Sequence, residues 1–589
     1  MKIFEANISF QVSVFLKEYL KNLTSFEIAN RKMIDACGIN FFFDNDDDFK
    51  TLYRLISTSS INLVEEPDRA EYGDFQTNSN LANKVVQQLS ARNIMPEIII
   101  EPTCGKGNFI TASLSNFKTI KQIFGVEIYK PYIWETKFSI LDFFLSNPNA
   151  NKPQITIAHC SIFDFDFKKI SKQFSADKLL IIGNPPWVTN SKLGSLNSTN
   201  LPQKTNFKNQ NGLDAMTGKG NFDIAEYITL MLLDAFQTHQ GNLSLLVKNS
   251  VIKNIVFDQK IKQYKIGNIE KYCINSKKEF NVSVEASLFN CQLNSSTGFK
   301  CTEFDFYNLE NKLSFGWLNS KFVSNIADYD ETKYIDGYCP FEWRQGMKHD
   351  NSSIMELERF NDHFVNKLSE EITLEEDLIY GFLKSSDLKN TVINNTRKHV
   401  IVTQKKVGQE TSYIQYSYPD TYSYLKKNIS SFLARKSSIY KGKPLFSIFG
   451  IGDYSFKPFK VAISGLYKTY HFTLVLPQKD KPVMLDDTCY FIGFDTIEYA
   501  VYSIILLNSK TTEEFLKSIT FSDAKRIFTK DLLMRLDMLK LASIIPQKEI
   551  DEQIIFLNNK YDLSISLSNW DSFINEMTPE KEKQLTIFG

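Results

Sequence analysis

Short apolar runs alternate with amphipathic segments between about residues 94 and 252. The runs that have the length of strands are 94–101, 123–128, 154–160, 177–183 and 243–252, and the segments with helical spacing are 110–117 and 225–236. Strands that alternate with helices along a chain predict a mostly parallel, doubly wound α/β sheet.

The flanking regions have other patterns. Residues 1–65 combine helical apolar spacing with an acidic patch, DNDDDF, whereas residues 189–221 are polar and have no periodicity. Beyond about residue 320, shorter strand-like runs precede a helical end. Because 589 residues are too many for one hydrophobic core, we expect a helical region over 1–65, an α/β domain over 66–320 and an α+β domain over 321–589.

Composition narrows the class of protein. With 43% hydrophobic residues, 23% charged residues and a formal net charge of zero, the chain has the composition of an ordinary globular protein. The eight cysteines are scattered and none forms C-x-x-C, so we expect no metal site, no disulfide framework and a reducing, cytoplasmic location. No apolar run reaches about 18 residues and no signal-peptide pattern opens the chain, so we expect no membrane span.

Charge is uneven along the chain. Residues 401–480 hold twelve Lys and Arg against four acidic residues, and Tyr and Phe are interleaved among them. This stretch is either a solvated surface or a face that contacts nucleic-acid phosphates, because Lys and Arg displace counterions from such a backbone. The candidate phosphate contacts are Lys405, Lys406, Lys441 and Lys443.

The segment EPTCGKGNF (101–109) joins the first expected strand of the α/β region to a helix. Gly105 and Gly107 bracket the turn, where glycine lets a backbone approach a ligand at a helix N-terminus. The segment is neither a dinucleotide fingerprint nor a phosphate loop, because the third glycine and the G-K-[ST] are missing. Glu127 ends the next strand, where an acid can accept both hydroxyls of a ribose.

The segment IIGNPPWVTN (181–190) ends a strand in a rigid turn. Two prolines after Gly183 stop the strand, because proline fixes its own φ and donates no backbone hydrogen bond. Asn184 offers a side-chain acceptor, the carbonyl of Pro185 offers a second, and two converging acceptors suit an –NH₂ group. Trp187 offers a flat face on which a planar ring can stack.

These elements together resemble the gamma-class amino DNA methyltransferases of restriction–modification systems. EPTCGKGNF, VEI and NPPW occur in that family's order and spacing, and GNFDIAEY (220–227) and EFNVSVEASLF (279–289) lie where two further motifs of the family lie. YGDFQT (72–77) looks like the motif that touches the methionine end of the cofactor, although Asn78 stands where the family usually has proline. The resemblance covers roughly residues 70–320.

The resemblance implies a Rossmann-like methyltransferase domain that transfers methyl from S-adenosylmethionine to adenine N6 in duplex DNA. The implied catalytic residues are Asn184, Pro185, Pro186 and Trp187, with Phe280 at the edge of the flipped base. The implied cofactor residues are Thr77, Glu101, Cys104, Gly105, Gly107, Glu127, Ile128, Ser161, Ile162 and Asp164. In HCSIFDFDF, Ser161 takes the place of the family's acid and Asp164 comes three residues later, so either residue is a candidate for contact with the cofactor's adenine.

The C-terminal half is expected to choose the DNA sequence. FEWRQGMKHD (341–350) and SDAKRIFTKDLLMRL (522–536) resemble segments of the target-recognition half of related enzymes, and the basic stretch lies between them. The implied partners are double-stranded DNA and a restriction endonuclease encoded separately, in a bacterial or archaeal cell. The alternatives are methylation of cytosine N4, RNA or protein glutamine, or a DNA-recognition subunit without catalysis.

Overall fold

The structure is a computed structural model that describes residues 8–58, 76–174, 178–189, 223–521 and 526–579. The chain divides into two compact units, Met1–Phe322 and Val323–Gly589, and each is considered by itself. Residues 190–222, which hold nearly all of the long polar segment, lie outside the described ranges.

The first unit is built on a ten-stranded sheet with the order β10-β9-β8-β6-β7-β5-β4-β1-β2-β3. Its strands are β1 (Ile98–Glu101), β2 (Gln122–Glu127), β3 (Gln154–His159), β4 (Leu179–Gly183), β5 (Gly241–Lys248), β6 (Ile266–Cys273), β7 (Ala286–Leu293), β8 (Lys300–Asp305), β9 (Asn311–Leu318) and β10 (Lys321–Val323). The five strands β3, β2, β1, β4 and β5 are parallel, and β7 is antiparallel to both β5 and β6. The predicted doubly wound, mostly parallel sheet is therefore confirmed over the motif-bearing strands.

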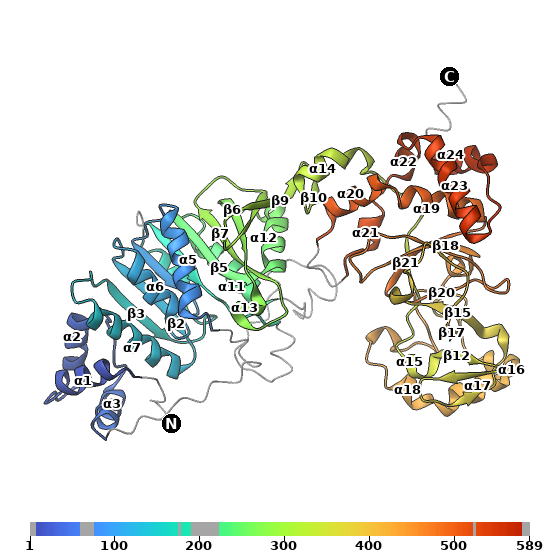
Figure 1. Ribbon diagram of the computed structural model, residues 1–589. Coiled ribbons are helices and arrows are strands. Elements are labelled where there is room, and N and C mark those ends of the chain that lie inside the picture. The colour runs from blue at the N-terminus through green and yellow to red at the C-terminus, as the bar shows by residue number, and fades with distance from the viewer. Residues whose placement is uncertain (1–7, 59–75, 175–177, 190–222, 522–525, 580–589) are drawn as a thin grey trace. The chain divides into compact units, whose positions relative to one another are not determined.

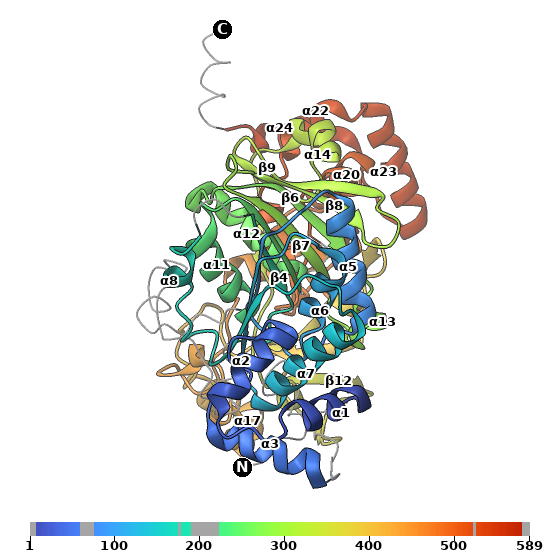
Figure 2. The same cartoon turned by 90° about the vertical axis from the view of Figure 1, so that its left-hand side faces the viewer.

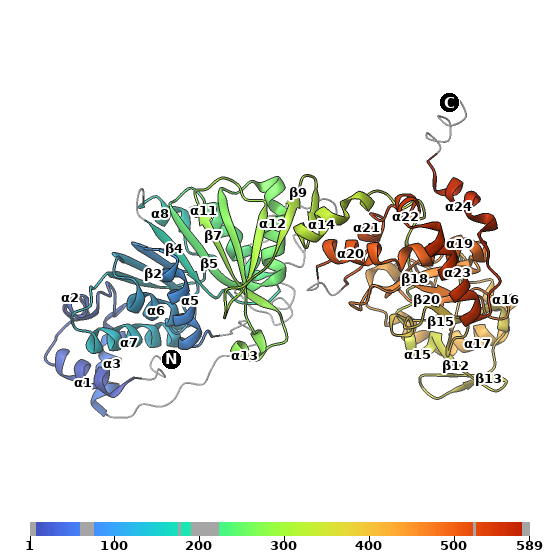
Figure 3. The ribbon, with the colours of Figure 1, turned by 45° about the horizontal axis from the view of Figure 1, so that its top comes forward.

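Helices cover both faces of this sheet, with α5, α6 and α7 on one face and α8, α11 and α12 on the other (Figures 2 and 3). The helices of this unit are α1 (Phe10–Tyr19), α2 (Phe26–Cys37), α3 (Asp46–Thr58), α5 (Ser79–Ala91), α6 (Asn108–Asn116), α7 (Lys130–Ser146), α8 (Phe167–Ser171), α11 (Ile224–Phe236), α12 (Asn249–Lys262) and α13 (Ser276–Phe280). Coverage on both faces explains why every residue of β1 and β4 is buried.

Two strand boundaries differ by several residues from the expectation, and the strand expected over 94–101 begins only at Ile98. The strand expected over 243–252 ends at Lys248, and Asn249 begins helix α12. Val251, Ile252, Ile255 and Val256 are buried at helical spacing, so the apolar residues after Lys248 face the core from a helix rather than from a strand.

The N-terminal helices pack on α7 within the first unit. Lys137 of α7 is fully buried, and its Nζ donates to the carbonyl oxygen of Phe42 at 2.9 Å. The Phe42 ring lies edge-on to Trp134, with 5.9 Å between centroids. Part of the acidic patch is also used here, because Asp44 and Asp48 form ion pairs with Lys130.

The second unit contains two smaller sheets (Figure 1). Their orders are β11-β21-β18-β19-β16 and β14-β13-β12-β17-β15-β20. The strands are β11 (Arg344–Gln345), β12 (Glu356–Phe360), β13 (His363–Asn366), β14 (Glu371–Ile372), β15 (Ile379–Leu383), β16 (Val392–Ile393), β17 (Lys398–Ile401), β18 (Phe459–Ser464), β19 (Thr473–Val475), β20 (Met484–Leu485) and β21 (Cys489–Phe494). The helices are α14 (Ile326–Thr332), α15 (Ser352–Met355), α16 (Ile414–Ser417), α17 (Pro419–Lys427), α18 (Ile429–Leu433), α19 (Ile497–Leu507), α20 (Lys510–Ile519), α21 (Lys530–Leu533), α22 (Met538–Ile544), α23 (Gln547–Tyr561) and α24 (Trp570–Met577). The helical end expected from the pattern is present from α19 onward.

Candidate active site

The glycine turn joins β1 to α6 in a backbone conformation that requires glycine. Gly105 has φ +52° and Gly107 has φ +76°, both in the left-handed region. A Cβ on Gly107 would lie 2.7 Å from the Cγ2 atom of Thr136, and a Cβ on Gly105 would lie 2.4 Å from Oε1 of Gln76. The turn is therefore packed closely against neighbouring side chains as well as being left-handed.

Glu127 lies against this turn. It closes β2 and is 8% exposed. Its Oε2 accepts a hydrogen bond from the backbone N–H of Gly105 at 2.8 Å, and its Oε1 accepts one from the N–H of Tyr129 at 2.7 Å. The two elements that the spacing placed in one βαβ unit are thus in direct contact at the carboxyl ends of β1 and β2.

Glu101 is the other carboxylate of this region. It ends β1 and is 2% exposed, and within the described part of the chain its Oε2 has no hydrogen-bond partner. Burial raises the pKa of Glu101 well above its ordinary value and the nearby Glu127 raises it further, although a backbone hydrogen bond from Ile110 acts in the opposite direction. Burial also raises the pKa of the Cys104 thiol well above its usual range, so Cys104 is not poised as a nucleophile.

The turn after β4 is hydrogen-bonded both to the segment 101–109 and to the segment 72–77. The backbone carbonyl of Asn184 accepts a hydrogen bond from Thr103 Oγ1 at 3.2 Å, and Asn184 Nδ2 donates to Thr77 Oγ1 at 3.2 Å. The carbonyl of Thr77 in turn accepts from Asn108 Nδ2 at 2.9 Å. Asn78, which replaces the family's proline, caps helix α5 by accepting from the N–H of Leu81 at 2.8 Å.

Trp187 and Phe280 come together beside this turn. Trp187 is 6% exposed, and its indole N–H donates to the carbonyl of Leu246 at 3.1 Å. The half-buried Phe280 ring meets it edge-on, with 4.9 Å between centroids and 69° between planes. The hydrogen bond to Leu246 in β5 fixes the direction of the indole.

The residues after β2 and β3 lie at the same edge of the sheet. The carbonyl of Ile128 is 3.2 Å from His159 Nε2, and Ser161 Oγ accepts from the N–H of Phe163 at 3.2 Å. Ile162 is buried, whereas Asp164 is exposed. Both Ser161 and Asp164 therefore stay candidates for the adenine contact.

Several residues that support the turns were not among the candidate site residues, although three of them lie inside the motif segments 72–77 and 101–109. Thr136 Oγ1 donates to the carbonyl of Gly105 at 2.8 Å, and Gln76 Oε1 accepts from the N–H of Lys106 at 3.3 Å. Thr103 and Asn108 act in the same way on Asn184 and Thr77. Thr136 lies outside every motif segment, so only the fold reveals its role, whereas the sequence motifs already contained the other three residues.

In the second unit, the four candidate lysines are exposed. Lys405 and Lys406 follow β17, and Lys441 and Lys443 follow a short 3-10 turn. Other cations of the 401–480 stretch have structural partners: Lys460 is fully buried, Lys427 pairs with Glu370, and Arg435 donates to the carbonyls of Leu445 and Ser447. The stretch is thus part surface and part core.

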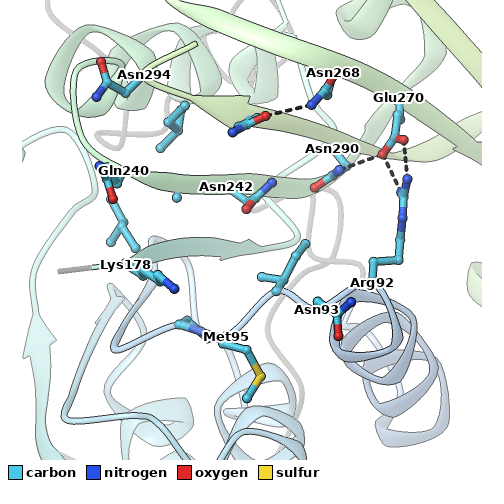
Figure 4. Close-up of a pocket in the computed structure, with 16 residues that line it drawn as sticks. Arg92, Asn93, Met95, Lys178, Gln240, Asn242, Asn268, Glu270, Asn290 and Asn294 are labelled. Carbon is cyan, nitrogen blue, oxygen red and sulfur yellow. Dashed lines mark hydrogen bonds and ion pairs between the residues drawn. The ribbon is translucent and has the colours of Figure 1, made fainter.

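A polar cavity of about 740 Å³ opens at the opposite edge of the first sheet (Figure 4). It lies where β4 and β5 begin, and none of the motif residues lines it. Glu270 pairs with Arg92 and accepts from Asn290 Nδ2 at 2.8 Å, and Asn268 Nδ2 donates to Gln292 Oε1 at 2.7 Å. These polar groups therefore bond to one another across the cavity wall.

Neither a metal-binding cluster nor a membrane-spanning helix is present in the described ranges. No three His, Cys, Asp or Glu side chains are grouped there so as to hold a metal ion. No helix in those ranges has the length and apolar character needed to cross a membrane.

The chain was compared with protein-family models, with curated proteins and with solved structures. No protein-family model matches the sequence. The chain is 40% identical over 485 residues to the type II methyltransferase M.NspV of Nostoc sp. (strain ATCC 29411 / PCC 7524), which covers 82% of this chain and 99% of that protein. Among solved structures, it is similar to the type IIL restriction-modification enzyme MmeI in complex with DNA, with a TM-score of 0.54 and 13% identity over 99% of this chain and 90% of that one. The likeness to MmeI shows a shared fold, and the extent of the identity to M.NspV shows that the chain belongs to the type II methyltransferases.

Proposed function

We propose that the protein methylates adenine N6 at specific sites in duplex DNA. The observation that carries this proposal is the bond between the NPPW turn and the cofactor-side motif, from Asn184 Nδ2 to Thr77 Oγ1. It holds an amide, at the end of a buried parallel strand, beside the elements expected to hold a methyl donor. Ligands of such sheets bind beyond the carboxyl ends of the strands, which is where both motifs lie.

The methyl donor is S-adenosylmethionine, as in other type II methyltransferases. The residues of the site fit such a ligand, because Glu101 Oε2 is buried with no hydrogen-bond partner among the described residues, and Glu127 stands at the end of β2. We infer that Glu101, Glu127 and the glycine turn hold the donor, with Ile128, Ile162 and either Ser161 or Asp164 beside its adenine. Its sulfonium methyl is already activated, so the protein supplies position and electrostatics.

The target nitrogen is a poor nucleophile because its lone pair is delocalised into the adenine ring. In the proposed mechanism, Asn184 Oδ1 and the carbonyl of Pro185 each accept one N–H of the target amine. These acceptors favour the positive charge that develops on nitrogen in the transition state. Pro185 and Pro186 keep the two acceptors at a fixed separation, because each fixes its own φ.

Thr77 is proposed as a positioning residue for this chemistry. A hydrogen-bond partner for the amide nitrogen holds the amide plane in one orientation and so directs its oxygen. Thr77 Oγ1 is that partner at 3.2 Å, and the hydrogen bond from Asn108 to the Thr77 carbonyl holds it in place.

A base inside a duplex must leave the stack to reach this site, at a cost of a few kcal/mol. We propose that the Trp187–Phe280 pair receives the flipped base, with Trp187 offering the face and Phe280 the edge. The hydrogen bond from Trp187 to Leu246 supports the proposal, because it orients the indole independently of the base.

The second unit is proposed to recognise the DNA sequence. The exposed Lys405, Lys406, Lys441 and Lys443 suit phosphate contacts, which position a protein without reading bases. We further propose a cognate restriction endonuclease on a separate chain. Cytosine N4, RNA and protein glutamine are the alternative substrates, and a recognition subunit without catalysis is the alternative role.

A methyl-transfer assay with Asn184→Ala tests the proposal. Radiolabelled donor is offered with duplex DNA, RNA and protein, and the labelled nucleoside is identified by mass spectrometry. We expect N6-methyladenine from wild type, and a loss of about 10²–10³-fold in Asn184→Ala with donor binding retained. Asn151→Ala, on the exposed surface of the same unit, is the control. A label on another substrate, or activity of Asn184→Ala within about tenfold of wild type, would refute the assignment.

A further inference from the structure

A buried carboxylate in the second unit has three lysines around it. Glu356 begins β12 and is 2% exposed. Lys384 Nζ lies 2.5 Å from its Oε1, and Lys367 and Lys398 Nζ lie 3.1 and 3.6 Å from its Oε2. The lysines come from the end of β13, the end of β15 and the start of β17, in the sheet that contains β12 (Figure 1). The fold thus brings three ammonium groups close to one carboxylate.

The local charge does not balance. His349 Nε2 is 3.7 Å from Glu356 Oε1, but burial lowers the pKa of His349 to about 4, so this imidazole is neutral near pH 7. Burial acts to raise the pKa of Glu356, yet hydrogen bonds from Lys384 and Lys367 outweigh it and the net shift is downward. The carboxylate is therefore ionised. In the described ranges, no other carboxylate lies within 4 Å of the three ammonium groups.

A structural role for Glu356 does not require this many cations. One lysine neutralises one carboxylate, and each further lysine adds repulsion among like charges. The carboxylate is shielded, but the lysines reach solvent, with side chains 42%, 28% and 19% exposed for Lys367, Lys384 and Lys398. Each ammonium group has three donors and Glu356 can take only part of them. The cluster therefore presents donors and about two units of excess positive charge to the surface.

We propose that Lys367, Lys384 and Lys398 form a phosphate-binding site for one phosphate of the DNA backbone, with Glu356 as the residue that positions them. An anion with several oxygens matches a set of converging ammonium donors and neutralises the excess charge. The proposal rests on the DNA-binding role proposed above. It adds a contact that lies before the basic stretch at 401–480, in residues that no motif marked.

The test is a salt titration of duplex binding with the full-length double variant Lys367→Gln/Lys398→Gln. Lys510→Gln/Lys548→Gln is the matched control, because it removes the same charge from two exposed helix lysines of this unit that pair with Glu514 and Glu552. We expect the salt slope of the lysine-cluster variant to fall by roughly one unit, with weaker binding to cognate and random duplexes alike. A slope and affinity equal to those of the control would overturn the proposal.

A second assay with inorganic phosphate distinguishes a site for free phosphate from a site for a phosphate of the DNA backbone. At matched ionic strength, phosphate instead of chloride should raise the melting temperature of wild type, but not that of the Lys367→Gln/Lys398→Gln variant. Glu356→Gln should respond to phosphate more strongly than wild type, because its lysines then lack any other anion. A wild type that binds phosphate here but no duplex would refute DNA binding while leaving the phosphate site in place. No difference between the variants in either assay would refute the site.

Discussion

Replacing Thr77 by valine tests the proposed positioning of the Asn184 amide. Valine keeps the β-branched shape of threonine but removes the Oγ1 atom that accepts from Asn184 Nδ2 at 3.2 Å. Thr77 is 6% exposed, so water is poorly placed to replace the lost acceptor. The Thr77 carbonyl, which accepts from Asn108 at 2.9 Å, is unchanged by the substitution, so the local backbone is expected to hold.

The magnitude follows from the cost of leaving the partly buried Asn184 donor unsatisfied, for which the range of about 1–3 kcal/mol for buried donors is the upper bound. If that cost appears in the transition state, where the amide must present its oxygen, methyl transfer slows by roughly 5–150-fold. The loss should appear in the rate of the chemical step at saturating donor, whereas the affinity for S-adenosylmethionine is measured separately by calorimetry. The second measurement distinguishes a positioning role from the contact with the donor that the motif implies.

The assay is single-turnover methyl transfer to duplex DNA by wild type, Thr77→Val and Thr77→Ser. Serine retains the hydroxyl, so Thr77→Ser should recover most of the rate. A Thr77→Val rate within about twofold of wild type would refute the reasoning. So would a Thr77→Ser enzyme as slow as Thr77→Val, because the hydroxyl would then not be the group that matters.

Three further outcomes follow from the structure. Gly107→Ala places a Cβ 2.7 Å from a methyl carbon of α7 at φ +76°, so calorimetry should show that donor binding is weakened by about tenfold or more. Gly408→Ala, at φ +81° with nothing within 4 Å, is the control, and equal donor affinities of the two variants would contradict the site. Lys441→Ala/Lys443→Ala should lower the salt slope of duplex binding by roughly one unit per lost phosphate contact, and an unchanged slope would make these lysines a solvated surface. Lys460 is fully buried, and burial lowers its pKa to about 7, below the value near 10.5 in an unfolded chain. Between these two pH values the unfolded state binds more protons than the folded state, so the free energy of unfolding rises with pH. Denaturant unfolding should show a rise of about 2 kcal/mol between about pH 7.5 and about pH 9.5 that Lys460→Met abolishes, and equal rises in both proteins would refute the burial argument.

The sequence by itself determined the elements whose causes are local. Continuous apolar runs specified the buried strands β1 and β4, because a parallel strand covered on both faces has no polar side. Gly105 and Gly107 marked the turn into a helix, and the structure places both in the left-handed region, where a Cβ would clash with the backbone. The order and spacing of the motifs then indicated a DNA methyltransferase of restriction–modification type, and membership of the type II methyltransferases agrees with that prediction.

The tertiary structure decided which distant groups meet. Asn184 reaches Thr77, 107 residues earlier, because β4 lies beside β1 in the sheet and Asn108, which follows β1, holds the segment that precedes α5. The first residues of the helix that begins at Asn249 were expected as the end of a strand, since the short apolar run of Val251 and Ile252 fits either pattern until the neighbours that cover it are known. Lys460 and Glu356 are buried although their residue types are usually exposed, and no pattern marked them. Burial and pairing depend on which strands the chain returns to, and that information is distributed over the whole fold rather than carried by any one segment.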